Sequence, residues 1–306
     1  MPGHKQGRSD RSHFVAQFHL AGFTPSGKKK DSLFVHDTIK YESRQQGVPV
    51  TAVSVGLYEV ENANIPSDQL EKLFGHYVEG PIAPIILRVC RTKELPESKD
   101  EFVSLIGYLS FAFNRTPTIM RSGDDVMTQV KDWLDRMGRG IRKSIERNQG
   151  KLELAQNDYV LQLLQFSLQF VPVMLQRKWH VVPVDPSIGH LVCTDNPVAV
   201  VGGGIGMRGT QIVCALDKST AIAGSFEGKP RYVINDVVHL AAFNSILLSR
   251  IDRFAYSTFA DFVYLEEDGK VCGAKQFLRS VEAQRWLLKR KDEREKGVIR
   301  IGRGLA

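Results

Sequence analysis

The chain of 306 residues lacks a long hydrophobic run. Its most apolar stretch, Tyr159 to Leu175, is interrupted by three glutamines and Pro172, whereas a membrane-spanning helix needs about 18 or more apolar residues in succession. Met1 is followed by polar and basic residues, without the short apolar segment of a secretory signal. We therefore expect no membrane partner and a cytoplasmic location.

Cysteine is scarce, with four residues and no pair at CxxC spacing. Each cysteine lies in an apolar stretch or beside a turn, which predicts reduced thiols and no disulfide framework. The sequence also lacks zinc-ligand spacings, a GxSxG nucleophile elbow and a P-loop lysine. These absences exclude the enzyme classes that are easiest to identify from a motif.

One glycine-rich segment, Gly204 to Gly209, has the GxGxxG spacing of dinucleotide-binding proteins. Phosphate binding by this motif requires a following helix whose amino end meets the phosphate. The next segment, Gln211 to Leu216, has the pattern of a strand, and no acidic residue lies ~20 positions on in the expected setting. The segment therefore predicts a hairpin loop, and we expect no dinucleotide cofactor.

Basic residues outnumber acidic ones, which gives a formal net charge of +7. They collect in four segments, at residues 5–11, 28–30, 136–147 and 285–303. This distribution favours a polyanionic partner such as nucleic acid or a nucleotide. The other explanation is that the basic runs are solvated faces of the fold.

The predicted elements change in kind along the chain. Strands come first, helices dominate residues 67–178, and short strands dominate residues 179–284, without sustained β-α-β alternation. This order predicts an α+β fold in which a mainly antiparallel sheet packs against a helical bundle. We expect a disordered leader over residues 1–12, a single domain over 13–284 and a basic tail over 285–306.

Local signals predict individual elements. Ser98 followed by Glu101 is a capping box for a helix that runs to Phe113. The segments 14–23 and 33–35 flank a basic turn and are expected to pair as a hairpin. The remaining expected helices cover residues 67–77, 124–148 and 158–179 and one that begins near Asp236, and the expected strands cover 50–60, 180–184, 191–194, 198–201, 211–216, 254–257 and 262–265.

Three polar stretches lie beside residues that should be buried. They are Arg11 to Phe18, Asn114 to Pro117 and Thr194 to Pro197. Burying hydrogen-bonding groups costs roughly 2–7 kcal/mol each unless partners are supplied. The simplest explanation is that the three stretches supply partners to each other and form one site.

The first and third stretches carry a base and an acid. His13 and Gln17 share a face on either a helix or a strand, so both can point at one spot, although a histidine among apolar residues also occurs as a core residue. Asp195 follows a buried strand, where it is a candidate general base, metal ligand or orienting partner of His13. The other explanation for Asp195 and Asn196 before a proline is an Asx-turn.

The second stretch carries cations. Arg115 and Arg121 bracket a proline turn and together can grip a phosphate or carboxylate, although an arginine at a helix carboxyl end is also explained by the helix dipole. Thr116 and Asn196 are candidate substrate-binding neighbours. Asn244 lies on the apolar stripe of its helix, so its amide needs partners, either a substrate or a helix-to-sheet hydrogen bond.

These stretches resemble a bacterial family, domain of unknown function number 4238. Thr194 to Pro197 is similar to its T-S-D-N-P signature. The other similarities are His13 to Phe18 with Leu20 and Phe23 (its H-x-x-P-x-x-x-L-x-x-F opening), Leu70-Glu71 with Glu79 (its early acidic helix), Arg115 to Pro117 (its arginine-threonine-proline element) and Asn244 before Tyr256-Ser257 (its last polar helix).

Two departures from the family pattern limit what the resemblance implies. Ala16 occupies the usual position of a proline, and Thr194 runs directly into Asp195 where the family has an intervening serine. We therefore assign no covalent catalysis to that position. The resemblance implies where the site lies and not which reaction it performs.

Two functions are compatible with these residues. The first is a phosphodiester- or nucleotide-directed hydrolase, with His13 as general acid/base, Asp195 orienting it or holding a divalent metal, and Arg115 and Arg121 stabilising phosphate charge. The second is a non-catalytic module of a bacterial defence or mobile-element system, which binds nucleic acid or a partner protein through the basic helix 136–147 and the tail. Substrate, metal dependence and oligomeric state stay open.

Overall fold

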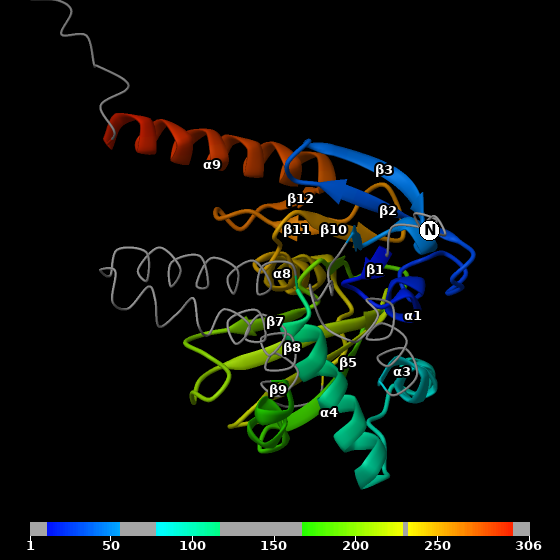
Figure 1. Ribbon diagram of the computed structural model, residues 1–306. Coiled ribbons are helices and arrows are strands. Elements are labelled where there is room, and N and C mark those ends of the chain that lie inside the picture. Colours follow the sequence, from blue (N-terminus) through cyan, green and yellow to red (C-terminus); the bar gives the residue numbers. More distant parts are fainter. Residues whose placement is uncertain (1–10, 56–77, 117–166, 229–231, 296–306) are drawn as a thin grey trace, which may run out of the picture.

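The computed structural model describes residues 11–55, 78–116, 167–228 and 232–295 (Figure 1). The elements of the first two ranges are β1 (Arg11–His13), α1 (Gln17–Ala21), β2 (Ser32–Asp37), β3 (Glu42–Gly47), the 3-10 helix η1 (Val48–Val50), β4 (Val53–Val55), α3 (Gly80–Thr92) and α4 (Lys99–Asn114). After a helical stretch at residues 167–175 come β5 (Lys178–Pro183), β6 (Cys193–Thr194), β7 (Val198–Val201), β8 (Gln211–Asp217), β9 (Thr220–Ser225), α8 (Val237–Leu248), β10 (Phe254–Ser257), β11 (Val263–Leu265), β12 (Val271–Gly273) and α9 (Ala274–Glu295).

The fold is α+β, as predicted, and its sheets are antiparallel. One four-stranded sheet has the order β5-β9-β8-β7, and we call it the central sheet. A second four-stranded sheet, β3-β2-β10-β6, is called the outer sheet. Two further strand pairs, β1-β4 and β11-β12, complete the described strands.

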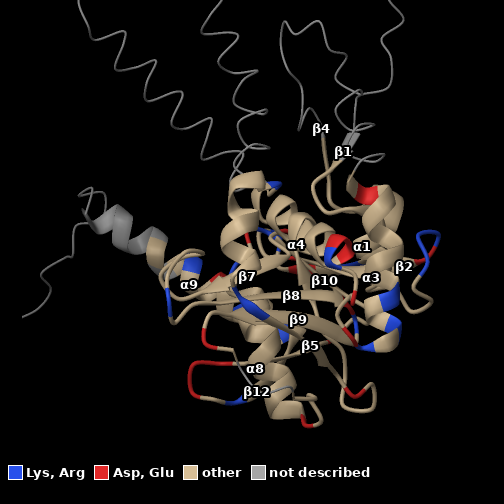
Figure 2. Cartoon of the chain, turned by 90° about the horizontal axis from the view of Figure 1, so that it is seen from below, with Lys and Arg blue, Asp and Glu red and all other residues tan. Residues whose placement is uncertain are grey.

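The elements stack in layers (Figure 1). Helices α3 and α4 cover one face of the central sheet, and α8 lies between the central sheet and the outer strands. Helix α9 packs on the far side against β2, β11 and β12. Seen from below, charged residues lie on loops and on helix surfaces such as α3, whereas the central strands carry few (Figure 2).

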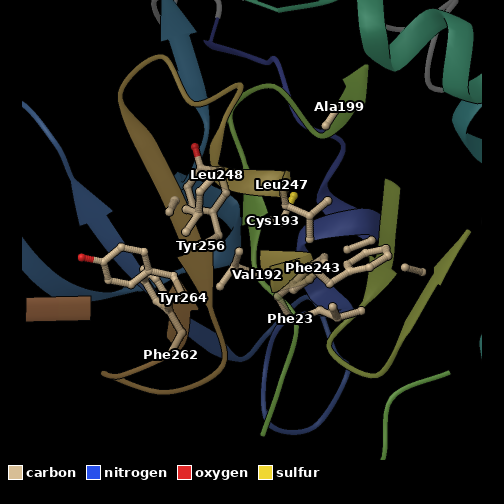
Figure 3. Packing of buried hydrophobic residues seen from close by; sticks show 14 of the residues in the cluster. Phe23, Val192, Cys193, Ala199, Phe243, Leu247, Leu248, Tyr256, Phe262 and Tyr264 are labelled. Atoms are coloured by element: carbon tan, nitrogen blue, oxygen red, sulfur yellow. The ribbon is translucent and has the colours of Figure 1, made fainter. Parts of the chain in front are cut away.

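The central sheet is buried on both faces because two cores meet it. On β8, Ile212 and Cys214 face the core formed with α3 and α4, whereas Val213 and Ala215 face the core formed with α8. Figure 3 shows the second core, in which Phe23, Phe243 and Tyr256 pack together with their neighbours. Burial on both faces explains why these strands are almost continuously apolar.

Helix α4 begins and ends as predicted, but its amino end is held differently. Ser98 is the N-cap residue, yet its side chain makes no capping hydrogen bond. Glu101 instead forms an ion pair with Arg88 of α3. The expected capping box is therefore wrong, because an interhelical partner competes for the glutamate.

The expected amino-terminal hairpin is also wrong. Strand β2 pairs with β3 on one side and with the distant β10 on the other, and the segment after β1 forms α1. The described part of the predicted helix 158–179 is helical up to residue 175, and Trp179 belongs to β5.

The glycine-rich segment is a hairpin loop between β7 and β8, as predicted.

The boundaries of the expected leader and tail fall inside elements. Strand β1 begins at Arg11, and α9 continues through residue 295. The guanidinium of Arg285 donates hydrogen bonds to the carbonyl oxygens of Thr38 (2.8 Å) and Asp252 (3.3 Å).

Among the residues described, no helix combines the length and apolarity that a bilayer crossing requires. The expected helices 67–77 and 124–148 and the basic segment 136–147 lie outside the described residues.

Candidate functional site

Two of the three polar stretches meet at one pocket. Thr116 follows the carboxyl end of α4, and Asn196 follows the end of β6. Both line a pocket of about 290 Å³, together with Ser249, Arg250 and Asp252 from the loop between α8 and β10. We call this the motif pocket. A volume of this size accommodates a small polar ligand.

Asp195 lies directly behind the wall of the motif pocket. Its side chain is buried, and its carboxylate accepts backbone N–H bonds from Asp252 (2.9 Å), Arg253 (2.6 Å) and Phe254 (2.8 Å). Burial raises the pKa of Asp195 to about 6, although these N–H donors act in the opposite direction. The carboxylate therefore holds the loop that carries Asp252 at the pocket.

Arg115 is the C-cap residue of α4 and is almost completely buried. Its Nη1 forms an ion pair with Glu79, the residue that precedes α3. Its guanidinium also lies over the ring of Phe111, 5.3 Å from the ring centroid. The arginine thus links the ends of two helices immediately beside Thr116.

Three other predicted site residues do not line the motif pocket. His13 is buried at the end of β1, opposite Val53 of β4, and Gln17 begins α1, so neither lines the motif pocket. Asn244 is fully buried; its Oδ1 accepts from the backbone N–H of Val192, and its Nδ2 donates to the carbonyls of His190 and Val263. Arg121 lies outside the described residues.

A metal site needs several acidic, histidine or cysteine ligands close together. Within the part of the chain that the structure describes, no group of three or more histidine, cysteine, aspartate or glutamate side chains is placed to hold an ion. The oxygens of Asp195 accept hydrogen bonds from three backbone N–H groups. Its proposed role as a metal ligand or as the orienting partner of His13 stays a prediction.

The three polar stretches lie within one segment that matches a known family. The model of the family described as Protein of unknown function (DUF4238) matches residues 11–261. The chain belongs to the DUF4238 family. No curated protein and no solved structure matches the chain. The DUF4238 match spans all the described residues that line the motif pocket and ends before β11.

A histidine that the sequence interpretation did not select organises the interior of this DUF4238 protein. His19 is fully buried in α1, with Nδ1 2.7 Å from the hydroxyl of Tyr108 and Nε2 2.7 Å from the carbonyl of Ala215. A carbonyl can only accept, so Nε2 carries the proton and Nδ1 accepts from the tyrosine. Burial lowers the pKa of His19 and raises that of Tyr108, which keeps both neutral.

A second buried histidine, His36, was also not among the predicted site residues. His36 of β2 is fully buried and lies between two serines, Ser43 of β3 and Ser257 of β10. Alternation along β2 places His36 on the face opposite the buried Leu33 and Val35, together with the half-buried Phe34. The strand pattern therefore predicts neither its burial nor its partners. The cross-strand pairing of His36 with Ser43 becomes visible only once the turn between β2 and β3 is known.

Proposed function

We propose that this protein binds a nucleotide or another phosphodiester in the motif pocket and hydrolyses it. The observation that carries the proposal is the meeting of Thr116 and Asn196, from two distant polar stretches, in one pocket beside Arg250. Polar groups that converge on a concave surface from separate elements are typical of ligand sites. The basic character of the chain supports an anionic ligand.

Arg250 is the group that best fits a phosphate. It is exposed in the motif pocket, and within the described residues its guanidinium makes no hydrogen bond or ion pair. A guanidinium can donate two parallel hydrogen bonds to phosphate oxygens. In this proposal Arg250 binds the phosphate, Thr116 and Asn196 orient the ligand, and Arg115 stabilises the wall from behind.

Hydrolysis requires a group that moves a proton. In the proposal His13 is the general acid/base, and Asp195 orients it or holds a divalent metal in the bound state. His13 lies on β1 and not in the lining of the motif pocket, so the proposed hydrolysis requires a ligand that extends from the pocket to β1. Binding and hydrolysis are therefore tested separately.

The binding test is isothermal titration calorimetry with AMP, ATP and a short single-stranded oligonucleotide. We expect Arg250→Ala to weaken binding about tenfold or more, because a hydrogen bond to a charged group contributes roughly 1.5–3 kcal/mol. Arg208→Ala is the matched control, since Arg208 is exposed on the loop at the other end of β7. No binding by the parent protein, or equal losses in the two variants, would refute the motif pocket as the binding site.

The hydrolysis test follows release of product from the ligand that binds best, with and without Mg²⁺. We expect turnover by the parent protein and loss of turnover, with binding retained, in His13→Gln. Tight binding without turnover in either condition rejects the hydrolase and leaves a binding module.

One observation favours the binding module as a second candidate. Lys28, Lys29 and Lys30 are all exposed on one turn, and Lys218 is anchored on the same turn by the carbonyls of Thr24 and Pro25. Several lysines on one surface bind a phosphate backbone through release of counterions. This candidate predicts a steep loss of oligonucleotide affinity with salt and a loss of binding when residues 28–30 are changed to glutamate.

Removal of the basic tail would not separate the two candidates if it began at residue 285. Arg285 bonds to the carbonyl of Asp252, which lines the motif pocket, so that truncation would disturb the pocket as well as the charge. Substitution of the lysines at 28–30 changes charge alone.

A further inference from the structure

The hydrogen bonds of His36 determine which of its ring nitrogens carries the proton. Nδ1 lies 2.8 Å from Ser43 Oγ, and Nε2 lies 2.7 Å from Ser257 Oγ. Ser257 has one hydroxyl proton and donates it to the carbonyl of Phe259 at 2.6 Å. Its oxygen must therefore accept from His36 Nε2–H, which leaves the lone pair of Nδ1 to accept the hydroxyl proton of Ser43.

Ser43 is in the position of an activated hydroxyl. Its proton points toward a neutral imidazole, so its oxygen lone pairs are free to face solvent. Burial lowers the pKa of His36 to about 4, which keeps the ring unprotonated at neutral pH, and the charge of Asp261 opposes that shift. Ser43 itself is exposed on β3.

Ser43 opens onto a second pocket, of about 580 Å³, between β3 and the start of α9. We call this the Ser43 pocket. Lys275 and Arg279 line it from α9, one helical turn apart, and neither has a hydrogen bond or ion pair within the described residues. Asp261 also lines it, but its Oδ1 accepts from the backbone N–H groups of Phe262 and Ala274. The pocket therefore offers two uncommitted cations beside the serine.

The backbone conformation of Tyr41 is a further indication that the Ser43 pocket is a functional site. It lines the same pocket with φ of 56°, a left-handed conformation that glycine adopts more easily. A bulky residue in this conformation costs about 1–2 kcal/mol, and such strain collects at functional sites.

We propose that Ser43 is the nucleophile of a second site, which hydrolyses carboxylic esters whose acyl group carries a negative charge. Lys275 and Arg279 hold the charge, and His36 is the base. Ser257 is a positioning residue that keeps the proton on Nε2. This site goes beyond the motif pocket, and the two pockets have no lining residue in common within the described part of the chain.

The reaction balances with water as the only co-reactant. Ser43 Oγ bonds to the ester carbonyl carbon while its proton passes to His36 Nδ1; the ester C–O bond breaks, and the leaving alcohol takes that proton. Water then attacks the acyl-serine carbonyl and gives a proton to His36 Nδ1. The C–O bond to Ser43 breaks, Oγ recovers the proton, and the free acid leaves.

The test uses a fluorophosphonate probe, which labels activated serines, and two esters, p-nitrophenyl succinate and the neutral p-nitrophenyl butyrate. We expect labelling of Ser43, identified by peptide mass, and about tenfold or more faster hydrolysis of the succinate ester. Ser43→Ala abolishes both labelling and hydrolysis, whereas Ser104→Ala, an exposed serine of α4 without a histidine partner, changes neither. Lys275→Ala with Arg279→Ala removes the preference for the charged ester.

Several outcomes would overturn the assignment. These are a folded parent protein that the probe does not label, labelling that survives in Ser43→Ala, and equal rates for the two esters. Circular dichroism verifies that each variant is folded, and Ser43→Ala is a mild change because the side chain is exposed. Ser257→Ala should lower kcat with little change in KM, since it disturbs the base and not the cations.

Discussion

At the scale of single residues, the interior of this protein depends on polar side chains that serve backbone groups. Asn244 is the clearest case, because one amide satisfies three backbone groups: the N–H of Val192 (3.1 Å) and the carbonyls of His190 (3.2 Å) and Val263 (2.9 Å). It thereby joins α8 to the segment before β6 and to β11. The asparagine on an apolar helix stripe thus has a structural role that the geometry explains in full.

Replacement of this amide should be costly. We expect Asn244→Leu to lower the free energy of unfolding by about 3 kcal/mol, since buried groups left without partners cost roughly 1–3 kcal/mol each. Urea unfolding measures the change. Asn235→Ala, at an exposed position just before α8, is the control and should shift stability by less than about 0.5 kcal/mol. Equal effects of the two substitutions would contradict this account of Asn244.

At the scale of elements, one arginine holds the glycine-rich loop between β7 and β8. Arg177 is buried, and its Nη1 donates to the carbonyls of Thr210 (2.7 Å) and Gly224 (3.3 Å). Its Nη2 donates to the carbonyl of Ile205 and to the hydroxyl of Thr210. A planar fork of donors is needed for this arrangement, which a lysine does not supply.

Loss of this fork should release the loop. We expect Arg177→Lys to lower the free energy of unfolding by about 2 kcal/mol and to speed amide hydrogen exchange across residues 202–210, because several buried carbonyls lose their donor. Hydrogen-exchange mass spectrometry measures the effect. Arg208→Ala removes an exposed arginine from the same loop and should leave exchange unchanged. Faster exchange in both variants would assign the effect to charge and not to the clamp.

Elements with a local sequence signal were predictable, whether helices or strands, and β7 (Val198–Val201) and β10 (Phe254–Ser257) have the expected bounds. The apolar spacing of α4 and the cap of α8, where Asp236 accepts from the N–H of His239, are local signals that a sequence displays directly. Strand β9 was missed because all of its residues are buried, so alternation is absent, and because it is rich in small residues. One of these, Gly224, lies opposite Trp179, and a Cβ there would approach the indole ring to 2.6 Å.

Polar edge strands were missed for a different reason. Strand β3, Glu42 to Gly47, carries no large apolar residue, and its pairing with β2 depends on the turn and on backbone hydrogen bonds. The partner of β2 on its other side, β10, lies more than half the chain away, which no local pattern indicates.

At the scale of the whole molecule, the sequence indicated part of the candidate site. The expectation that polar stretches meet holds for Thr116 and Asn196 at the motif pocket, because each follows the end of an element that packs on α8 or the central sheet. The pairing of His36 with Ser43 and Ser257 was not indicated. A buried histidine looks the same in a sequence whether it faces a serine, a carbonyl or a tyrosine.

Two buried ionisable groups act on the stability of the whole molecule in opposite directions. The pKa of His36 falls from 6.5 to about 4 on folding, so the unfolded chain binds a proton first and stability is lost as pH falls through this interval. The pKa of Asp195 rises from 3.8 to about 6, so the folded protein binds a proton first and stability is gained as pH falls. Each shift corresponds to about 3 kcal/mol, and the two contributions largely cancel between pH 4 and pH 6.

Variants should separate the two contributions. Between pH 7 and pH 4, we expect the stability of the parent relative to Asp195→Asn to rise by about 3 kcal/mol, and its stability relative to His36→Gln to fall by a similar amount, because each variant removes one proton-binding group. Urea unfolding across this pH range measures both differences, and other carboxylates cancel because they are common to all three proteins. If the two stability differences changed with pH in the same direction, the buried groups would titrate together as one unit. If a stability difference did not change with pH, the substituted group would keep the same pKa in the folded and unfolded chain.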